Sequence, residues 1–459
     1  MRRKILGVAG IVSGMTIAQQ KPNIVFILTD DMGWSDPGCY GNPFNETPHI
    51  DSLAREGIRF TNAYAACPVS SPSRAAILTG KYPARLQLTN FLVGERTDPQ
   101  SPVLPAPWKP LLESREVTLA ELLKQAGYTT GLVGKWHLGG HDTIAPWGQG
   151  FDYTRMIGKN GLDYYNYSIY EDSYQKEFTD TGTVYLTDKL TQYAIDFIDR
   201  NKQKPFFLYL AYSAPHVMII PRGDKLKKYF FKYHTWKGKY NPYYAAMVES
   251  IDDGVGAVVD FLKKNGLYDN TLIVFTSDNG GVGLPELGPT PTTCEPLRKW
   301  KGHVYEGGIR VPAIVVWKGK IPSGQVCEHY FSHVDYLPTF CEILKIKKLP
   351  SGVDGKSILP VLTNPATTAF NRGPVYWHYP HFSNQEGRPA GAIRDGDYKL
   401  IEHYETHRLE LYNLREDIGE TNDLSQQLPE KTKQLHDMFL KWCKEVNAQM
   451  PLPNPEYKK

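Results

Sequence analysis

The segment from Ser70 to Gly80 combines a reactive hydroxyl with features that attract anions. Pro72 suits the first position of a helix, because its fixed φ fits there and its missing N–H has no intrahelical partner. Ser71 is a favourable N-cap, and Gly80 can end the helix in a left-handed conformation. Free N–H groups and the helix dipole favour negative charge near Ser70, and the guanidinium of Arg74 can bind an oxyanion with two hydrogen bonds. The spacing predicts a reactive residue facing an anion-binding pocket, with an ordinary capped surface helix as the alternative.

Two acidic pairs offer oxygen ligands only. Asp30 and Asp31 follow one apolar segment, and Asp278 and Asn279 follow another. Carboxylate and amide oxygens suit Ca²⁺ or Mg²⁺ rather than zinc. Each pair alone would more often form a turn or a cap. Two such pairs at separate strand ends, beside an anion-binding helix, favour a metal site.

Further cations and proton donors occur in short polar loops. Lys135 and His137 lie two residues apart between glycines, His216 follows Ala-Pro, and Lys301 precedes a glycine-rich turn. Each of these alone could be an ordinary exposed or structural side chain. Together they can surround a tetrahedral anion with positive charge and proton donors, which sulfuryl transfer requires.

The segments that precede these residues have the pattern of buried strands. Apolar runs at 23–29, 129–133, 206–212 and 272–276 end at the polar clusters, and helical patterns at 119–126, 186–200 and 243–265 lie between them. This alternation predicts an α/β sandwich with a large central mixed sheet flanked by helices. Because ligands bind beyond the carboxyl ends of strands in such sheets, we expect all four clusters to form one active site.

The C-terminal part of the chain predicts a small α+β domain with an antiparallel sheet. Strand patterns at 391–401 and 408–414 are joined by 402–407, and 429–450 reads as an amphipathic helix. The sequence therefore predicts three parts: a signal peptide (1–20), a catalytic domain (21–371) and a C-terminal subdomain (372–459).

The first residues predict export. Arg2, Arg3 and Lys4 precede an apolar run that ends near Ala18 and is short for a membrane-spanning helix, which is typical of a secretory signal peptide. We therefore expect a periplasmic or secreted protein without a transmembrane segment. The six cysteines could form disulfides in that compartment, but the sequence does not determine their pairing. A net charge of +3, from 52 basic and 49 acidic residues, gives no support to nucleic-acid binding.

The motifs, taken in order, resemble those of type I, formylglycine-dependent sulfatases, close to the arylsulfatase and N-acetylgalactosamine-sulfatase group. They are Asp-Asp-Met-Gly-Trp at 30–34, Ser-x-Pro-Ser-Arg at 70–74, Gly-Lys-Trp-His-Leu-Gly at 134–139, Ala-Pro-His at 214–216, Ser-Asp-Asn-Gly-Gly at 277–281 and Lys-Gly-x-x-Tyr-Glu-Gly-Gly at 301–308. The resemblance implies an alkaline-phosphatase-like fold, one Ca²⁺, and a formylglycine (3-oxoalanine) made from Ser70 by a maturation enzyme and hydrated to a gem-diol.

The resemblance also implies a role for each site residue. The diol attacks sulfur to form a covalent sulfoenzyme intermediate, His216 protonates the leaving alcohol, and His137 then takes a proton from the second hydroxyl to expel sulfate. The sulfate charge is stabilised by Arg74, Lys135 and Lys301, and the calcium is held by Asp30, Asp31, Asp278, Asn279 and residue 70.

Residue 70 departs from many relatives, which have cysteine there. On this resemblance, the chain would be either a sulfatase whose serine is oxidised or one in which an engineered serine blocks maturation. Two alternative functions stay open: a related phosphatase or phosphotransferase with two zinc ions, although extra histidine ligands are lacking, and a non-catalytic binder of sulfated glycans if Ser70 stays unmodified.

An aromatic-rich segment, Tyr-Trp-His-Tyr-Pro-His at 376–381, indicates a carbohydrate substrate. His378, His381 and Arg394 are candidates for binding sugar hydroxyls over the cleft, although they could equally stabilise the contact between the domains. We expect an exo-acting enzyme on sulfated sugars of the galactose or N-acetylgalactosamine type, with the 4-O position ranked before the 6-O position.

Overall fold

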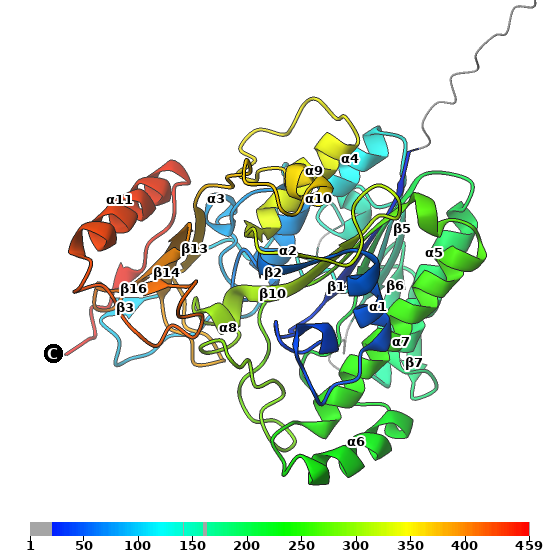
Figure 1. Ribbon diagram of the computed structural model, residues 1–459, viewed down its shortest axis with the longest axis horizontal. Helices are drawn as coiled ribbons and strands as arrows, with labels where there is room; N and C mark the ends of the chain where they lie inside the picture. The colour runs from blue at the N-terminus through cyan, green and yellow to red at the C-terminus, as the bar shows by residue number, and fades with distance from the viewer. Residues whose placement is uncertain (1–20, 141, 159–162, 459) are drawn as a thin grey trace, which may run out of the picture.

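A central sheet of eleven strands organises the computed structural model, which describes residues 21–140, 142–158 and 163–458 (Figure 1). Its order is β11-β2-β10-β9-β1-β8-β4-β5-β6-β7, with β12 beside β2. Five neighbouring strands, β9, β1, β8, β4 and β5, are parallel, whereas β10, β6 and β7 pair antiparallel. The strands are β1 (Asn23–Thr29), β2 (Ile58–Tyr64), β4 (Thr129–Gly134), β5 (Tyr153–Ile157), β6 (Asn166–Glu171), β7 (Glu177–Thr181), β8 (Phe206–Ala211), β9 (Thr271–Ser277), β10 (Arg310–Val316), β11 (Gln325–Cys327) and β12 (Phe331–Ser332).

Helices cover both faces of this sheet, which explains the unbroken apolar runs in its parallel strands. In β1, Phe26 and Leu28 face one hydrophobic core, and Val25 and Ile27 face the other. The first core lies under α2 (Ser70–Thr79), α4 (Leu119–Gln125), α9 (Tyr336–Ile343) and α10 (Leu359–Thr363). The second lies under α1 (Pro48–Glu56), α5 (Leu186–Asn201) and α7 (Pro242–Lys264), with α6 (Gly223–Thr235) packed on α7. The predicted mixed sheet flanked by helices is confirmed.

A smaller antiparallel sheet forms the C-terminal subdomain, as predicted. Its strands, in the order β13-β14-β15-β16, are β13 (Val375–Tyr379), β14 (Ala390–Asp395), β15 (Tyr398–His403) and β16 (Arg408–Asn413). Leu400 packs with residues of α11 (Pro429–Glu445), while its neighbour Ile401 packs against the catalytic domain, so alternate side chains serve two cores. Figure 1 shows α11 over the outer side of this sheet.

Three details of this region differ from the sequence prediction. The stretch 391–401 is not one strand but most of the β14–β15 hairpin, turned at Gly396 with φ +61°. The aromatic segment forms the edge strand β13, and α11 ends at Glu445 instead of residue 450. A separate two-stranded sheet pairs β3 (Val103–Leu104) with β17 (Leu452–Pro453). The boundary at residue 372 stays a prediction.

The remaining expectations on organisation have separate outcomes. All six cysteines are free, so the possible disulfides do not form. No helix within the described ranges is both long and apolar enough to cross a membrane. The predicted signal peptide, 1–20, lies outside the described residues and stays a prediction.

A buried ion network joins the two domains. The ammonium of Lys399 in β15 lies 2.9 Å from Glu306 Oε1 and 2.8 Å from Glu420 Oε1, and all three side chains are fully buried. Glu306 begins α8 (Glu306–Ile309) and also accepts a 2.6 Å hydrogen bond from Arg310 Nε. Because buried charges are tolerated only when paired, this network fixes the subdomain against the segment that follows Lys301.

We expect Lys399→Met to lower the free energy of unfolding by about 3–5 kcal/mol, because it leaves two buried carboxylates without their shared cation. Guanidinium-induced unfolding followed by fluorescence measures the change. Lys433→Met is the matched control, since Lys433 forms an exposed pair with Asp437 in α11, and it should hardly move the midpoint. Equal midpoints for the two variants would contradict a stabilising role of the buried network.

Candidate active site

The predicted site residues meet at one edge of the central sheet. Asp30 and Asp31 follow β1, Lys135 follows β4, His216 follows β8, and Asp278 follows β9. These four strands are parallel and adjacent in the order β9-β1-β8-β4, so their carboxyl ends lie side by side. The four polar clusters therefore meet at one edge of the sheet, as predicted.

Carboxylates form the floor of the site. Asp30, Asp31 and Asp278 are all 0% exposed. The backbone N–H of Asp31 donates to Asp278 Oδ1 at 3.2 Å, and the side-chain amide of Asn279 donates to Asp31 Oδ1 at 2.7 Å. Asp31 has a positive φ of 65°, a conformation that Asp tolerates better than most residues and that occurs at functional turns.

Ser70 points its hydroxyl at this floor from the first turn of α2. Its Oγ lies 3.1 Å from Asp30 Oδ1 and 3.3 Å from Asn279 Oδ1. The helix begins at Ser70, not at Pro72 as predicted, and no side chain caps it, because its N-cap residue is Val69. The Ser71 hydroxyl accepts a hydrogen bond from the Leu92 N–H. Ser70 is therefore part of the helix terminus itself, where the free N–H groups lie.

Three cations neutralise the carboxylates. The Arg74 guanidinium is fully buried and contacts Asp278 Oδ2 through Nε at 2.9 Å and through a terminal nitrogen at 2.8 Å. Lys135 Nζ lies 2.5 Å from Asp30 Oδ2, and Lys301 Nζ lies 2.6 Å from Asp31 Oδ2.

The charges at this floor shift the pKa values of its members in opposite directions. Burial and the charge of Asp30 raise the pKa of Asp278 to about 6. For Asp30, burial opposes ionisation, but the charges of Lys135, Arg74 and Lys301 together hold its pKa well below the usual range. The carboxylates thus compete for positive charge, which a bound cation would supply.

Both predicted histidines have neutral rings in this environment. Burial and the charge of Lys301 lower the pKa of His216 to about 4. Burial and the charges of Lys135 and Arg74 lower the pKa of His137 well below its usual value. His216 Nε2 lies 3.5 Å from Asp31 Oδ2, and its Nδ1 contacts the carbonyl of Val217.

The donor set fits a hard cation. Three carboxylates and an amide oxygen supply oxygen ligands, and Asp30, Asp31 and His216 each offer a ligand atom within 4.8 Å of the others. Among the described residues, this cluster includes neither a thiolate nor the second histidine that a typical zinc site would add. The residues present therefore fit calcium, and the buried hydroxyl of Ser70 beside them fits the position of a modified residue.

A cavity of about 650 Å³ opens above this floor and is large enough for a sugar ring. Asp30, Ser70 and Lys301 line its base. Its walls include Trp136 of the Gly-Lys-Trp-His-Leu-Gly motif, and aromatic, apolar and amide side chains that no sequence motif singled out: Phe91, Leu92, Val93, Met156, Tyr170, Tyr174, Asn384 and Gln385.

The three predicted sugar-binding residues do not line this cavity. The ring of His378 is held between the Tyr404 hydroxyl and the carbonyl of Gln449, 2.6 and 2.9 Å away. His381 bonds the Thr89 hydroxyl at 2.8 Å, and Arg394 bonds Asn62 and Tyr64. All three are buried, so the alternative role, stabilising the subdomain, is the one that their contacts support.

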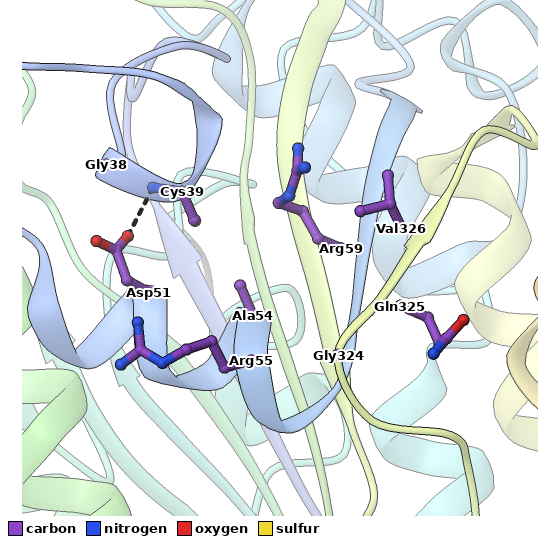
Figure 2. Close-up of a pocket in the computed structure, with 9 residues that line it drawn as sticks. All are labelled: Gly38, Cys39, Asp51, Ala54, Arg55, Arg59, Gly324, Gln325 and Val326. Carbon is purple, nitrogen blue, oxygen red and sulfur yellow. Dashed lines mark hydrogen bonds between the residues drawn. The ribbon is translucent and has the colours of Figure 1, made fainter.

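A second pocket lies away from these residues, between η1 (Gly38–Tyr40), α1 and the start of β2 (Figure 2). It measures about 260 Å³, and Figure 2 shows Cys39 and Asp51 on one side with Arg59 on the other. The N–H of Cys39 donates to Asp51 at 2.7 Å. None of the predicted site residues lines it.

Family comparison gives an independent result. A family model described as "Sulfatase" matches residues 22–346, and one described as "N-sulphoglucosamine sulphohydrolase, C-terminal" matches residues 299–448. The chain belongs to the sulfatase family. It is accordingly a sulfuric ester hydrolase, and the phosphatase alternative loses its support.

Individual relatives extend this result. The sulfatase is 33% identical to a "Sulfatase" of Formosa agariphila over 94% of its own chain and 89% of that protein. It is 36% identical to the N-acetylgalactosamine-6-sulfatase of Canis lupus familiaris over 86% of its own chain and 74% of that protein. Among solved structures, Ps i-CgsB in complex with k-i-k-neocarrahexaose has a TM-score of 0.79 at 32% identity, covering 92% of this chain and 93% of that one.

We expect Arg74→Lys to lower kcat/KM on an aryl sulfate about a hundredfold. The planar guanidinium has enough N–H groups to bind Asp278 and an oxyanion at the same time, whereas the ammonium group of lysine cannot reproduce that geometry. Steady-state sulfate release measures the loss, and the thermal midpoint checks folding. Arg85→Lys is the control, because Arg85 forms a similar fork with Asp354 at 2.6 and 2.9 Å outside the cavity. Losses of the same size in both variants would contradict a catalytic role for Arg74.

Proposed function

We propose that this sulfatase hydrolyses sulfate esters of carbohydrates, acting from the chain end on sugars of the galactose or N-acetylgalactosamine type. The observation that carries the proposal is the position of Ser70, whose Oγ lies 3.1 Å from Asp30 at the base of a sugar-sized cavity, with Arg74 and Lys301 at the same floor. Negative charge brought there meets a helix N-terminus and fixed cations.

The site requires a formylglycine made from Ser70 and a calcium ion, which supply the nucleophile and additional positive charge beside it. Asp30, Asp31, Asp278 and Asn279 are the residues that would hold the calcium together with residue 70. Oxidation of the serine needs a maturation enzyme, and that enzyme belongs to the proposal, as does export through the N-terminal signal peptide to the periplasm or the medium.

The protein's own residues divide the remaining work. Arg74, Lys135 and Lys301 bind the sulfate oxygens and stabilise charge that develops on them. His216 lines the cavity and donates a proton to the leaving oxygen. A bound anion offsets the cations that lower the pKa of His216, so the ring can carry that proton when substrate is present. His137 has a neutral ring and therefore can accept a proton from residue 70.

The sugar class draws support from relatives, and the sulfate position is the open part of the proposal. The sequence prediction ranks the 4-O position first. The relatives from dog, pig and rat carry the name N-acetylgalactosamine-6-sulfatase, and a structure of BT4656 with D-glucosamine-2-N,6-O-disulfate has a TM-score of 0.73. These names favour the 6-O position, so an assay must compare both.

Matured enzyme should release sulfate from terminal N-acetylgalactosamine or galactose sulfates, and should act poorly on internal sulfates and on the matching phosphate esters. The sequence ranking expects the 4-sulfate to react faster, whereas the names of the relatives expect the 6-sulfate to react faster, and the ratio of the two rates decides between them. Ion chromatography measures the release, and mass spectrometry establishes whether residue 70 is an aldehyde. Ser70→Ala should bind the sulfated sugar without turning it over, since binding depends on charge and N–H donors.

Three results would count against parts of this proposal. A faster reaction with the 6-sulfate reverses the ranking. Preference for phosphate esters refutes the substrate class. Tight binding of sulfated sugars without turnover, by natively produced protein in which residue 70 is still serine, favours the non-catalytic binder.

Chelation with EGTA should lower the thermal midpoint and abolish activity, because the buried carboxylates then lose a divalent counter-ion. Calcium at a hundred times its Kd stabilises the folded state by about 2.7 kcal/mol. Calorimetry of wild-type protein and of Asp31→Asn, with calcium or zinc added back, measures this shift. If zinc, and not calcium, restores the thermal midpoint and the activity, the calcium assignment is wrong.

A further inference from the structure

The loop between β13 and β14 reaches from the C-terminal subdomain to the catalytic floor. Its turn closes through a 2.8 Å hydrogen bond from the Ser383 N–H to the carbonyl of Gly387. A Cβ on Gly387 would lie 1.7 Å from the carbonyl oxygen of Gly302, and a Cβ on Gly302 would lie 2.3 Å from Ser383 Oγ. The loop is therefore packed backbone to backbone against the residue that follows Lys301.

This packing holds Gln385 at the cavity wall. Its N–H donates to Ser383 Oγ at 3.0 Å, and its carbonyl accepts from Trp300 Nε1 at 3.0 Å, so its backbone is fixed on both sides. The residue is 8% exposed and lines the cavity. Its side-chain oxygen Oε1 is buried and has no hydrogen-bond partner within the described part of the chain.

An unpaired amide oxygen in such a place points to a ligand. Buried polar atoms are paired in the great majority of cases, because burial without a partner costs the full desolvation of the group. Two other atoms at the same cavity share this property, Ser213 Oγ and His137 Nδ1. Those two residues follow β8 and β4 at the anion end of the site, whereas Gln385 approaches from the other domain.

We propose that Gln385 determines which sugar the enzyme accepts, by hydrogen bonding a hydroxyl or the N-acetyl group of the sulfated ring. This inference rests on the proposed function. An amide both donates and accepts, which matches a sugar hydroxyl or a second amide, and the neighbouring aromatic side chains of Phe91 and Tyr174 give the ring an apolar surface. An aryl sulfate such as 4-nitrophenyl sulfate has no hydroxyl or amide group that could donate to the Gln385 oxygen.

The test compares Gln385→Met with wild type on two substrates, the best sulfated sugar and 4-nitrophenyl sulfate, using enzyme with matched aldehyde content. Methionine keeps the length of the side chain and removes its hydrogen bonds. We expect kcat/KM on the sugar to fall about tenfold more than on the aryl sulfate. Glu386→Gln is the matched control, because Glu386 is the exposed neighbour in the same loop and does not line the cavity.

Sugar analogues that lack one hydroxyl or the N-acetyl group identify the partner. For wild type, kcat/KM should be about tenfold lower on one analogue than on the complete sugar. For Gln385→Met, kcat/KM should be the same on that analogue and on the complete sugar, because the contact is already lost. The inference is overturned, and the proposed function is not, if Gln385→Met lowers kcat/KM equally on the sugar and the aryl sulfate. The same holds if each analogue lowers kcat/KM by the same factor in wild type and in Gln385→Met. A wild-type enzyme that hydrolyses the aryl sulfate and no sugar sulfate overturns the proposed function and this inference with it.

Discussion

Three carboxylates buried in one small volume repel one another, and the arrangement of the site follows from that repulsion. Asp30, Asp31 and Asp278 are all inaccessible to water, so their charges are weakly screened. Such a cluster is tolerated only where cations approach it closely. Arg74 comes from a helix and Lys301 from the segment before α8, so elements far apart in the sequence must converge. The adjacent parallel strands β1 and β9 bring the three carboxylates to one edge of the sheet, and α2 and the segment before α8 bring the cations to them.

The same balance of charge prepares the site for an ester that carries negative charge. Lys135 and Lys301 pair with Asp30 and Asp31 at 2.5 and 2.6 Å, so the lysines and the carboxylates satisfy each other. A divalent cation on the carboxylates would compete with these pairs and leave ammonium groups available to a sulfate. Cation and anion would therefore favour each other's binding through shared electrostatics, without a change of fold.

Sequence reasoning found the parts of the site that local pattern determines. The apolar runs of β1 and β9 identify strands, and the rule for parallel sheets then places Asp30 and Asp278 at one edge. The start of α2 was predicted two residues late, because the helix is capped at Val69, whose side chain gives no capping signal, while the Ser71 hydroxyl bonds the distant N–H of Leu92. His378 has the appearance of a sugar-binding residue, yet tertiary contacts occupy both of its ring nitrogens.

Gln385 shows why the walls of the cavity were harder to predict than its floor. Nothing in its local sequence distinguishes it, and its position depends on backbone contact between Gly387 and Gly302. The segment that follows Lys301 thus contacts the subdomain at two points, at Gly302 through this backbone contact and at Glu306 through its pair with Lys399. A loop anchored beside a catalytic cation can change its side chains without moving that cation. Substrate preference can therefore change in this loop while the chemistry at the floor is preserved.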